Sequence, residues 1–182
     1  VPLTDGVITD DHRIKCAMPT IFRILKDKPN RLIIMSHFGR PNGVDEDYSM
    51  RKLIPKLEKY IDKGVGLLGS GLNQSTLDQL VLEHDYQVYL LENLRFHEEE
   101  MKYKSMDLTN NESYQVIQKL GNVYVNDAFG CMHRDHLSIT GIQIPEKAYG
   151  FLVEKELHAL HNITQNKSLK KILAIIGGGK MD

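Results

Sequence analysis

The sequence has almost no net charge and no long apolar segment, and each absence excludes a class of protein. Its 23 basic and 24 acidic side chains give a formal net charge of -1, so no overall field steers the chain toward nucleic acid or an anionic membrane. No apolar run approaches the roughly 20 residues that a spanning helix needs. We therefore expect neither nucleic acid nor membrane as a partner, and any anion site must be built locally.

Cysteine is also scarce. Cys16 and Cys131 are the two cysteines of the 182-residue chain, and they stand far apart in it. Such a pair does not form a disulfide framework, which favours a reducing compartment. Residues 1–10 lack the basic and apolar regions of a secretory signal. We expect a cytoplasmic protein.

Short apolar runs alternate with amphipathic segments along the chain. The apolar runs predict strands at residues 32–36, 65–68, 87–91, 122–126 and 171–176. The amphipathic segments predict helices at 18–28, with Pro19 near the start, and at 50–62, 73–84, 110–120 and 151–163. Strands joined through helices form parallel sheets that are covered on both faces. The predicted fold is α/β, a three-layer Rossmann-like domain with a mostly parallel sheet flanked by helices.

Three arginines follow the ends of predicted strands, namely Arg40, Arg95 and Arg134. Ligands of such sheets bind beyond the carboxyl ends of the strands, and a guanidinium fork matches pairs of carboxylate or phosphate oxygens. Any one of these arginines alone is equally consistent with an exposed or salt-bridged surface residue. Together they favour a cradle for an anion.

A histidine directly follows the first of these strands. His37 stands in the segment 36–41 (SHFGRP), where a ring nitrogen can donate to a phosphate or carboxylate oxygen and Gly39 lets the backbone approach a ligand. A lone histidine in a turn is more often structural. The neighbouring glycine and Arg40 favour the binding interpretation.

The remaining candidates for metal ligation are weaker. His133 and His136, with Cys131 nearby, allow a metal hypothesis, but a His-x-x-His pair without further clustered ligands is poor support for zinc. The acidic run at 98–100 is interpreted as a solvated helix start. We predict no metal site in this chain.

Near its end the chain carries the glycine-lysine segment 177–180 (GGGK), after the polar, basic stretch 167–171, which is typical of a connection. It is not a P-loop, because Ala174 stands where that motif needs glycine and Met181 where it needs a hydroxyl. Lys180 can still offer a positive charge to a transferring phosphoryl group, although an exposed lysine after a turn is the usual interpretation.

Six segments, in order and over nearly the whole chain, resemble the phosphoglycerate kinase family. They are 10–14 (DDHRI), 36–41 (SHFGRP), 90–97 (LLENLRFH), 125–130 (VNDAFG), 151–157 (FLVEKEL) and 177–180 (GGGK). The resemblance implies a monomeric two-domain kinase that moves a phosphoryl group reversibly from 1,3-bisphosphoglycerate to ADP, giving 3-phosphoglycerate and ATP, with Mg²⁺ on the nucleotide.

The same resemblance implies a division of the chain. Residues 1–165 would be the phosphoglycerate-binding domain, lacking a first strand that in the family ends in a substrate-contacting Asp-Phe-Asn. Residues 166–182 would be the interdomain connection and the first strand of a nucleotide-binding domain that lies outside this sequence. Because ADP, ATP and Mg²⁺ would bind there, we expect the chain alone to be inactive.

Residue roles are implied by position in the motifs. The residues that resemble the family's substrate-binding patch are Arg13, His37, Arg40, Arg95 and Arg134. Arg13 resembles the arginine placed against the transferring group, and Lys180 resembles a lysine that shields phosphoryl charge at the nucleotide. Both are the implied catalytic residues. His12, Cys131, Met132 and Asp135 depart from the commoner family residues.

Two other classes of function stay open. A non-catalytic module that binds a phosphate anion would keep the same basic residues, and measurable turnover by the chain alone would separate the two. A nucleotide-binding α/β protein that uses the glycine-lysine turn is the third, and tight ATP binding by the isolated chain would favour it.

Overall fold

The computed structural model describes residues 2–4, 7–165 and 173. The strands are β1 Leu3–Thr4, β2 Val7–Ile8, β3 Leu32–Ile34, β4 Val65–Leu68, β5 Val88–Leu91, β6 Val123–Asn126 and β7 Glu146–Tyr149. The helices are α1 His12–Lys26, α2 Ile54–Ile61, α3 Gln74–Leu82, α4 Glu99–Lys102, α5 Glu112–Lys119, α6 Leu137–Thr140 and α7 Phe151–Gln165. Short 3₁₀ turns are η1 Glu46–Tyr48, η2 Met50–Leu53, η3 Leu94–Phe96, η4 Tyr103–Ser105 and η5 Phe129–Cys131.

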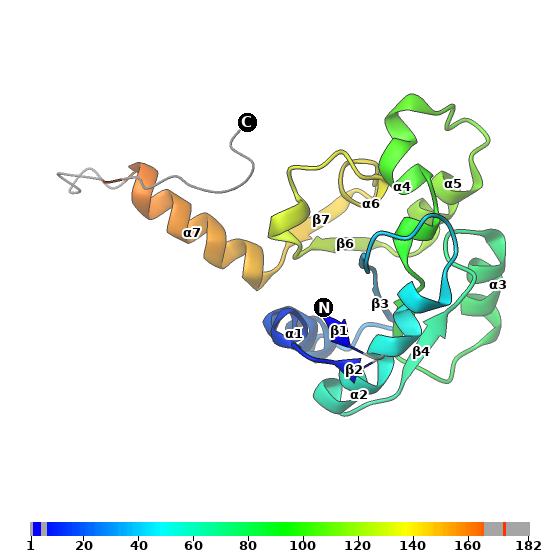
Figure 1. Ribbon diagram of the computed structural model, residues 1–182, viewed down its shortest axis with the longest axis horizontal. Helices are drawn as coiled ribbons and strands as arrows, with labels where there is room; N and C mark the ends of the chain where they lie inside the picture. Colours follow the sequence, from blue (N-terminus) through cyan, green and yellow to red (C-terminus); the bar gives the residue numbers. More distant parts are fainter. Residues whose placement is uncertain (1, 5–6, 166–172, 174–182) are drawn as a thin grey trace.

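The strands that follow helices pair in parallel, as predicted. β5 lies between β3 and β4 and is parallel to both, and β6 is parallel to β7. Only β1 and β2, within the described part of the chain, pair in antiparallel fashion. The α/β class is thereby confirmed, although the described parallel strands fall into two sheets (Figure 1).

Both faces of the larger sheet are covered. Successive residues of β5 point to opposite faces, and each set is buried in a different core cluster. Val88 and Leu90 belong to a core cluster with the buried faces of α1 and α2. Tyr89 and Leu91 belong to a second cluster with residues of α3 and α5. The sheet is therefore the middle of three layers.

The start of α1 was predicted wrongly. The proline at position 19 suggested a helix beginning near it, but α1 begins at His12 and carries Pro19 in its interior. Ile14, Met18 and Ile21 are four and three residues apart and are all buried, so one apolar stripe continues through the proline. Burial of that stripe outweighs the hydrogen bond that proline removes.

The other predicted elements lie within a few residues of the observed ones. β7 was missed because Glu146–Tyr149 is exposed throughout and carries no alternation of apolar and polar residues. The strand predicted at 171–176 falls outside the described residues. Within the described part of the chain, no helix combines the length and the apolarity that crossing a membrane would require.

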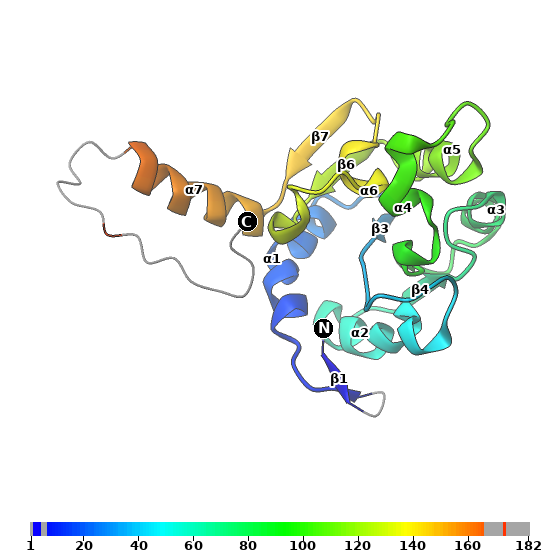
Figure 2. The same ribbon diagram turned by 45° about the horizontal axis from the view of Figure 1, so that its top comes forward.

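Asp127, just beyond β6, fixes the start of α7, which extends away from the sheets in both views (Figures 1 and 2). Its Oδ1 accepts hydrogen bonds from the backbone amides of Leu152 and Val153 at 2.9 and 3.1 Å. Its Oδ2 accepts one from Thr20 Oγ1 at 2.6 Å, and that hydroxyl accepts from the amide of Phe151 at 2.9 Å. The carboxylate thus caps α7 and joins it to α1.

We predict that Asp127→Ala lowers the free energy of unfolding by about 1–3 kcal/mol, because it leaves the first amides of α7 without acceptors. Urea unfolding followed by circular dichroism measures the change. Asp85→Ala, which removes an exposed carboxylate, is the control and should change stability by less than about 0.5 kcal/mol. Equal losses in both variants would show that Asp127 is not a cap.

His97 contributes a pH dependence to folding. Its Nε2 accepts a hydrogen bond from the amide of Leu72 at 3.0 Å, so the folded state needs the neutral ring. Burial lowers the pKa of His97, against the opposing charges of Glu99, Glu100 and Glu112. A histidine whose pKa is depressed by folding stabilises the protein above its unfolded pKa of about 6.5, and this contribution is lost as pH falls.

We therefore predict that the free energy of unfolding falls between about pH 7 and pH 5, and that His97→Gln makes this fall shallower. Glutamine places an acceptor oxygen near Leu72 without titrating in this range. Chemical unfolding at several pH values gives both slopes. Parallel curves for the two proteins would refute the role of His97.

Candidate anion-binding site

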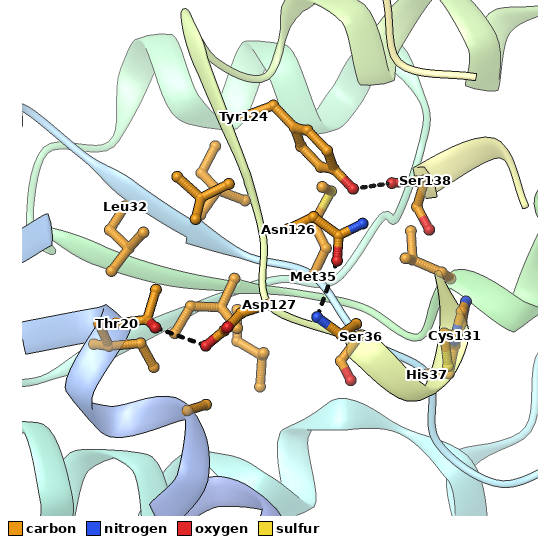
Figure 3. Close-up of a pocket in the computed structure, with 18 of the residues that line it drawn as sticks. Thr20, Leu32, Met35, Ser36, His37, Tyr124, Asn126, Asp127, Cys131 and Ser138 are labelled. Atoms are coloured by element: carbon orange, nitrogen blue, oxygen red, sulfur yellow. Dashed lines mark hydrogen bonds between the residues drawn. The ribbon is translucent and has the colours of Figure 1, made fainter. Parts of the chain in front are cut away.

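A cleft of about 2100 Å³ is lined by β3, by β6 and by the buried face of α1. β3 and β6 are not paired with each other, and residues of both line the cleft, as does Thr20 of α1 (Figure 3). The loops that follow β3, β5 and β6 also line it. The predicted substrate-binding residues that line this one cleft are Arg13, His37, Arg40, Arg95 and Arg134. Lys180 lies outside the described residues.

Asn93, directly after β5, binds the loop that follows β3. Its side chain is completely buried. Nδ2 donates to the carbonyl oxygens of Phe38 and Tyr48 at 2.7 and 2.9 Å, and Oδ1 accepts from the amides of Phe38 and Arg95, both at 3.2 Å. One amide group therefore sets the loop carrying His37 and Arg40 against the turn carrying Arg95.

Glu92 reinforces this connection. It is buried, and its carboxylate accepts hydrogen bonds from Ser49 Oγ and the Met50 amide, both at 2.7 Å, and from the Asn93 amide at 2.8 Å. A buried carboxylate is tolerated when its oxygens are satisfied in this way. The chain between β3 and α2 is thus held at the end of β5.

Arg95 is the central cation of the site. It is half-buried, and its Nη1 donates to the carbonyl oxygen of Gly39. Burial, followed by the neighbouring charges of Arg134 and Arg40, lowers the pKa of Arg95 from its ordinary value. An arginine stays protonated in proteins, so these cations repel one another. A bound anion would relieve that repulsion.

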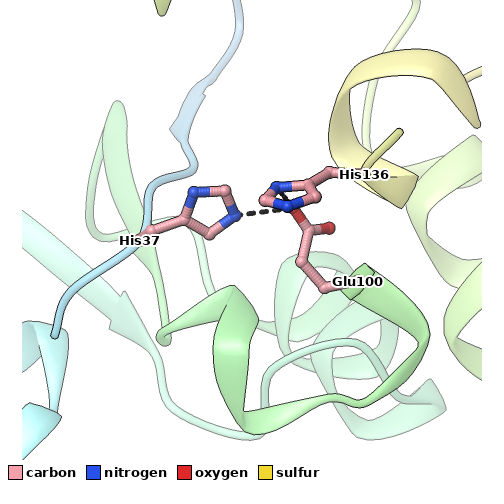
Figure 4. A group of neighbouring side chains, drawn as sticks. All are labelled: His37, Glu100 and His136. Carbon is pink, nitrogen blue, oxygen red and sulfur yellow. Dashed lines mark hydrogen bonds and ion pairs between the residues drawn. The ribbon is translucent and has the colours of Figure 1, made fainter. Parts of the chain in front are cut away.

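Glu100 of α4 lies near the basic residues of the cleft, and its side chain is 0% exposed. His37 Nε2 lies 2.6 Å from Oε1, and His136 Nδ1 lies 3.4 Å from the same oxygen (Figure 4). Ser138 donates to Glu100 twice, through its amide at 3.0 Å and its hydroxyl at 2.6 Å. The interpretation of 98–100 as a solvated helix start holds for the exposed Glu98 and is wrong for Glu100.

The two histidines of the 131–136 segment lie in different environments. His133 is exposed, whereas His136 is buried and packs edge-on against the ring of His37. Burial lowers the pKa of His136, outweighing the nearby Glu100 carboxylate, and the charges of His37, Arg134 and Arg95 lower it further. His136 therefore groups with His37 and Glu100 and not with His133 and Cys131.

Arg13 and Arg40 form the exposed part of the site. Both are exposed, and Arg13 lines the cleft from the first turn of α1. Among the described residues, no hydrogen bond or ion pair joins Arg13 to the other predicted site residues. The structure thus holds His37 and Arg95 firmly and leaves two guanidinium groups free to approach a ligand.

The sequence did not predict which residues position the cations. These are Glu92, Asn93, Glu100, His136 and Ser138. The first two directly follow β5, where a polar pair after an apolar run is a usable signal. No sequence pattern indicates that Glu100 is buried while Glu98 is exposed. Together the fold and the cleft define an α/β protein in which basic side chains line a cleft beside the ends of parallel strands.

Comparisons with known proteins identify the family. A model of the phosphoglycerate kinase family matches residues 1–182. The phosphoglycerate kinase of Debaryomyces hansenii is 40% identical over 190 residues, covering 100% of this chain and 45% of that protein. That of Schistosoma mansoni is 38% identical over 192 residues, covering 100% and 46%. The chain belongs to the phosphoglycerate kinase family, and it spans about half the length of the curated relatives it matches.

The fold agrees with this assignment. The structure of phosphoglycerate kinase from Coxiella burnetii superposes with a TM-score of 0.74 at 30% sequence identity, covering 91% of this chain and 40% of that one. The structure of phosphoglycerate kinase from Pyrococcus horikoshii OT3 gives a TM-score of 0.71 at 29% identity. The likeness therefore holds in three dimensions as well as in sequence.

We predict that Gly39→Ala disrupts the loop that carries His37 and Arg40. Gly39 has φ +60°, and a Cβ there would collide with the ring of Tyr48. The left-handed backbone alone costs a residue with a side chain about 1–2 kcal/mol, so the free energy of unfolding should fall by at least that amount.

Gly69→Ala is the matched control, because an added Cβ there meets only ordinary contacts, with Leu67 Cδ2 at 3.8 Å. Urea unfolding of the two variants compares them directly. A Gly39→Ala protein as stable as the Gly69→Ala protein would contradict the described conformation of the loop.

Proposed function

We propose that this chain is the acid-phosphate-binding part of a phosphoglycerate kinase and that it holds 3-phosphoglycerate or 1,3-bisphosphoglycerate in the cleft. The observation that carries the proposal is that five basic residues from four separate segments line one cleft: Arg13, His37, Arg40, Arg95 and Arg134. Guanidinium forks bind the paired oxygens of a carboxylate or a phosphate. The substrate carries both groups.

The chemistry that such a site supports needs no nucleophile from the protein. Phosphoryl transfer depends on holding donor and acceptor oxygens in line and on stabilising charge that spreads over the transferring group. We assign His37, Arg40, Arg95 and Arg134 to holding the acid phosphate, and Arg13 and Lys180 to the transferring group. A well-placed donor of this kind contributes about 2–4 kcal/mol to the transition state.

We place nucleotide binding, and with it the reversible transfer to ADP, outside residues 1–165. Residues 166–182 are proposed as the connection to a nucleotide-binding domain and its first strand. Mg²⁺ bound to ADP or ATP would neutralise phosphate charge. The clustered ligand set among the described residues contains two imidazoles, whereas Mg²⁺ prefers oxygen ligands in octahedral geometry, so we place the Mg²⁺ site outside residues 7–165.

We also propose a monomer in the cytoplasm, without nucleic acid or membrane partners. The supporting observations are a formal net charge of -1 and two free cysteines, Cys16 and Cys131. A reducing compartment keeps such thiols unpaired.

A non-catalytic anion-binding module is the second candidate, because the same basic residues would line the cleft in such a module. A coupled assay with ADP and 1,3-bisphosphoglycerate addresses both candidates. We expect no turnover from this chain alone and turnover once a nucleotide-binding domain of the family is joined to it. Turnover by the chain alone would contradict the placement of the nucleotide site.

We predict that isothermal calorimetry detects 3-phosphoglycerate binding to the chain and that the double variant Arg40→Ala, Arg134→Ala reduces affinity by at least 100-fold. Each lost hydrogen bond between charged groups is worth about 1.5–3 kcal/mol, and two of them exceed the roughly 2.7 kcal/mol that corresponds to this factor.

The matched control is Arg23→Ala, Arg51→Ala, which removes the same net charge from exposed arginines that do not line the cleft. It should bind within a few-fold of the unmodified chain. If both double variants bind equally well, or lose affinity equally, the cleft is not the site.

A further inference from the structure

His37, Glu100 and His136 come from the β3 loop, from α4 and from the residue before α6, and they meet at one point (Figure 4). Each offers one ligand atom, and these atoms all lie within 4.8 Å of one another. Each side chain is at least four-fifths buried, with exposed fractions of 14%, 0% and 7%. Three buried side chains that can each ligate a metal ion therefore converge from distant segments of the chain.

One of these atoms lacks a hydrogen-bond partner. His136 Nδ1 is buried and makes no hydrogen bond, although it points toward Glu100 Oε1 at 3.4 Å. Buried polar atoms are nearly always satisfied, and an orphan atom that faces other ligand atoms suggests an ion at that place. This observation is independent of how the site binds an acid phosphate.

The donor set fits zinc. Two histidines and one glutamate with an open fourth position form a known tetrahedral zinc arrangement, with bonds of about 2.0–2.2 Å and hence about 3.3 Å between ligand atoms. The separation of 3.4 Å between His136 Nδ1 and Glu100 Oε1 already matches this value. His37 Nε2 lies 2.6 Å from the same oxygen, which is a hydrogen-bond distance, so these two atoms must move slightly apart when an ion binds.

The surroundings orient the carboxylate and provide access. Ser138 donates its amide to Glu100 Oε2 and its hydroxyl to Oε1, which is how ligating carboxylates are commonly held. His37 and Ser138 line the cleft, so the fourth position would face the cleft and water or an anion. Arg95 and Arg134 lie close enough to oppose a cation, and we therefore expect weaker binding than at a structural zinc site.

We propose that His37, Glu100 and His136 bind a divalent transition metal ion of the zinc type. Each imidazole binds through the nitrogen that faces Glu100 and keeps its proton on the other ring nitrogen. The ion replaces the hydrogen bond between His37 and Glu100 and satisfies His136 Nδ1. A metal bound here holds His37, so it also changes how the cleft binds anions.

The test uses the 182-residue chain with Zn²⁺ in calorimetry and with Co²⁺ in visible absorption, where four-coordinate cobalt gives strong bands. We expect one ion per chain. His136→Ala should weaken Zn²⁺ binding at least tenfold, while His133→Ala, which removes an exposed histidine from the same segment, should leave it unchanged. Glu100→Gln, which keeps acceptor oxygen for Ser138, should also weaken binding.

A measurement on the unmodified chain covers the case in which a variant does not fold. Nitrogen-15 spectra of the eight histidine rings should show Zn²⁺ shifting Nε2 of His37 and Nδ1 of His136. The proposal would be overturned if Zn²⁺ did not bind stoichiometrically or if it shifted only other histidines. It would also be overturned if His133→Ala lost Zn²⁺ binding while His136→Ala retained it. Binding of 3-phosphoglycerate to the metal-free chain tests the proposed function and does not decide whether the metal site exists.

Discussion

The site depends on one buried side chain, the amide of Asn93. It sits at the end of the central strand β5 and forms hydrogen bonds with the backbone of Phe38, Tyr48 and Arg95. The loop after β3 and the turn after β5 therefore cannot move independently. Because a buried amide that loses its partners costs about 1–3 kcal/mol, this arrangement resists rearrangement when ligands bind or leave.

Electrostatics imposes the second constraint. Arg40, Arg95 and Arg134 repel one another, and a fold that gathers them needs negative charge nearby. Glu100 supplies it from behind, fully buried and bonded to His37 and Ser138. Cations thus line the cleft with a buried carboxylate beside them, and the proposed binding of a small anion rests on this arrangement.

Much of the architecture was predictable because it follows from periodicity. The runs at 65–68 and 87–91 are apolar and match β4 and β5 closely, and the four-residue spacing of Leu53, Leu57 and Ile61 predicts the helical segment that contains α2. β7 was not predictable, since its four residues are exposed. The start of α1 was missed because a local proline signal competed with the buried stripe of Ile14 and Met18.

The candidate site was likewise predictable only in part. Its cations could be identified because arginine and histidine after strand ends are a chemical signal, and the structure brings them to one cleft. The groups that hold them could not, because burial of Glu100 and Asn93 arises from contacts between residues 38 to 63 positions apart. The sequence therefore indicated the basic residues that line the cleft and did not indicate the buried groups that position them.

The most direct test of the account is a crystal structure of this chain grown with 3-phosphoglycerate. The account predicts one ligand in the cleft, with carboxylate or phosphate oxygens about 3 Å from guanidinium nitrogens of Arg40 and Arg134 and with the Asn93 hydrogen bonds intact. A ligand bound elsewhere, or guanidinium groups of Arg40, Arg95 and Arg134 directed away from one another, would contradict it.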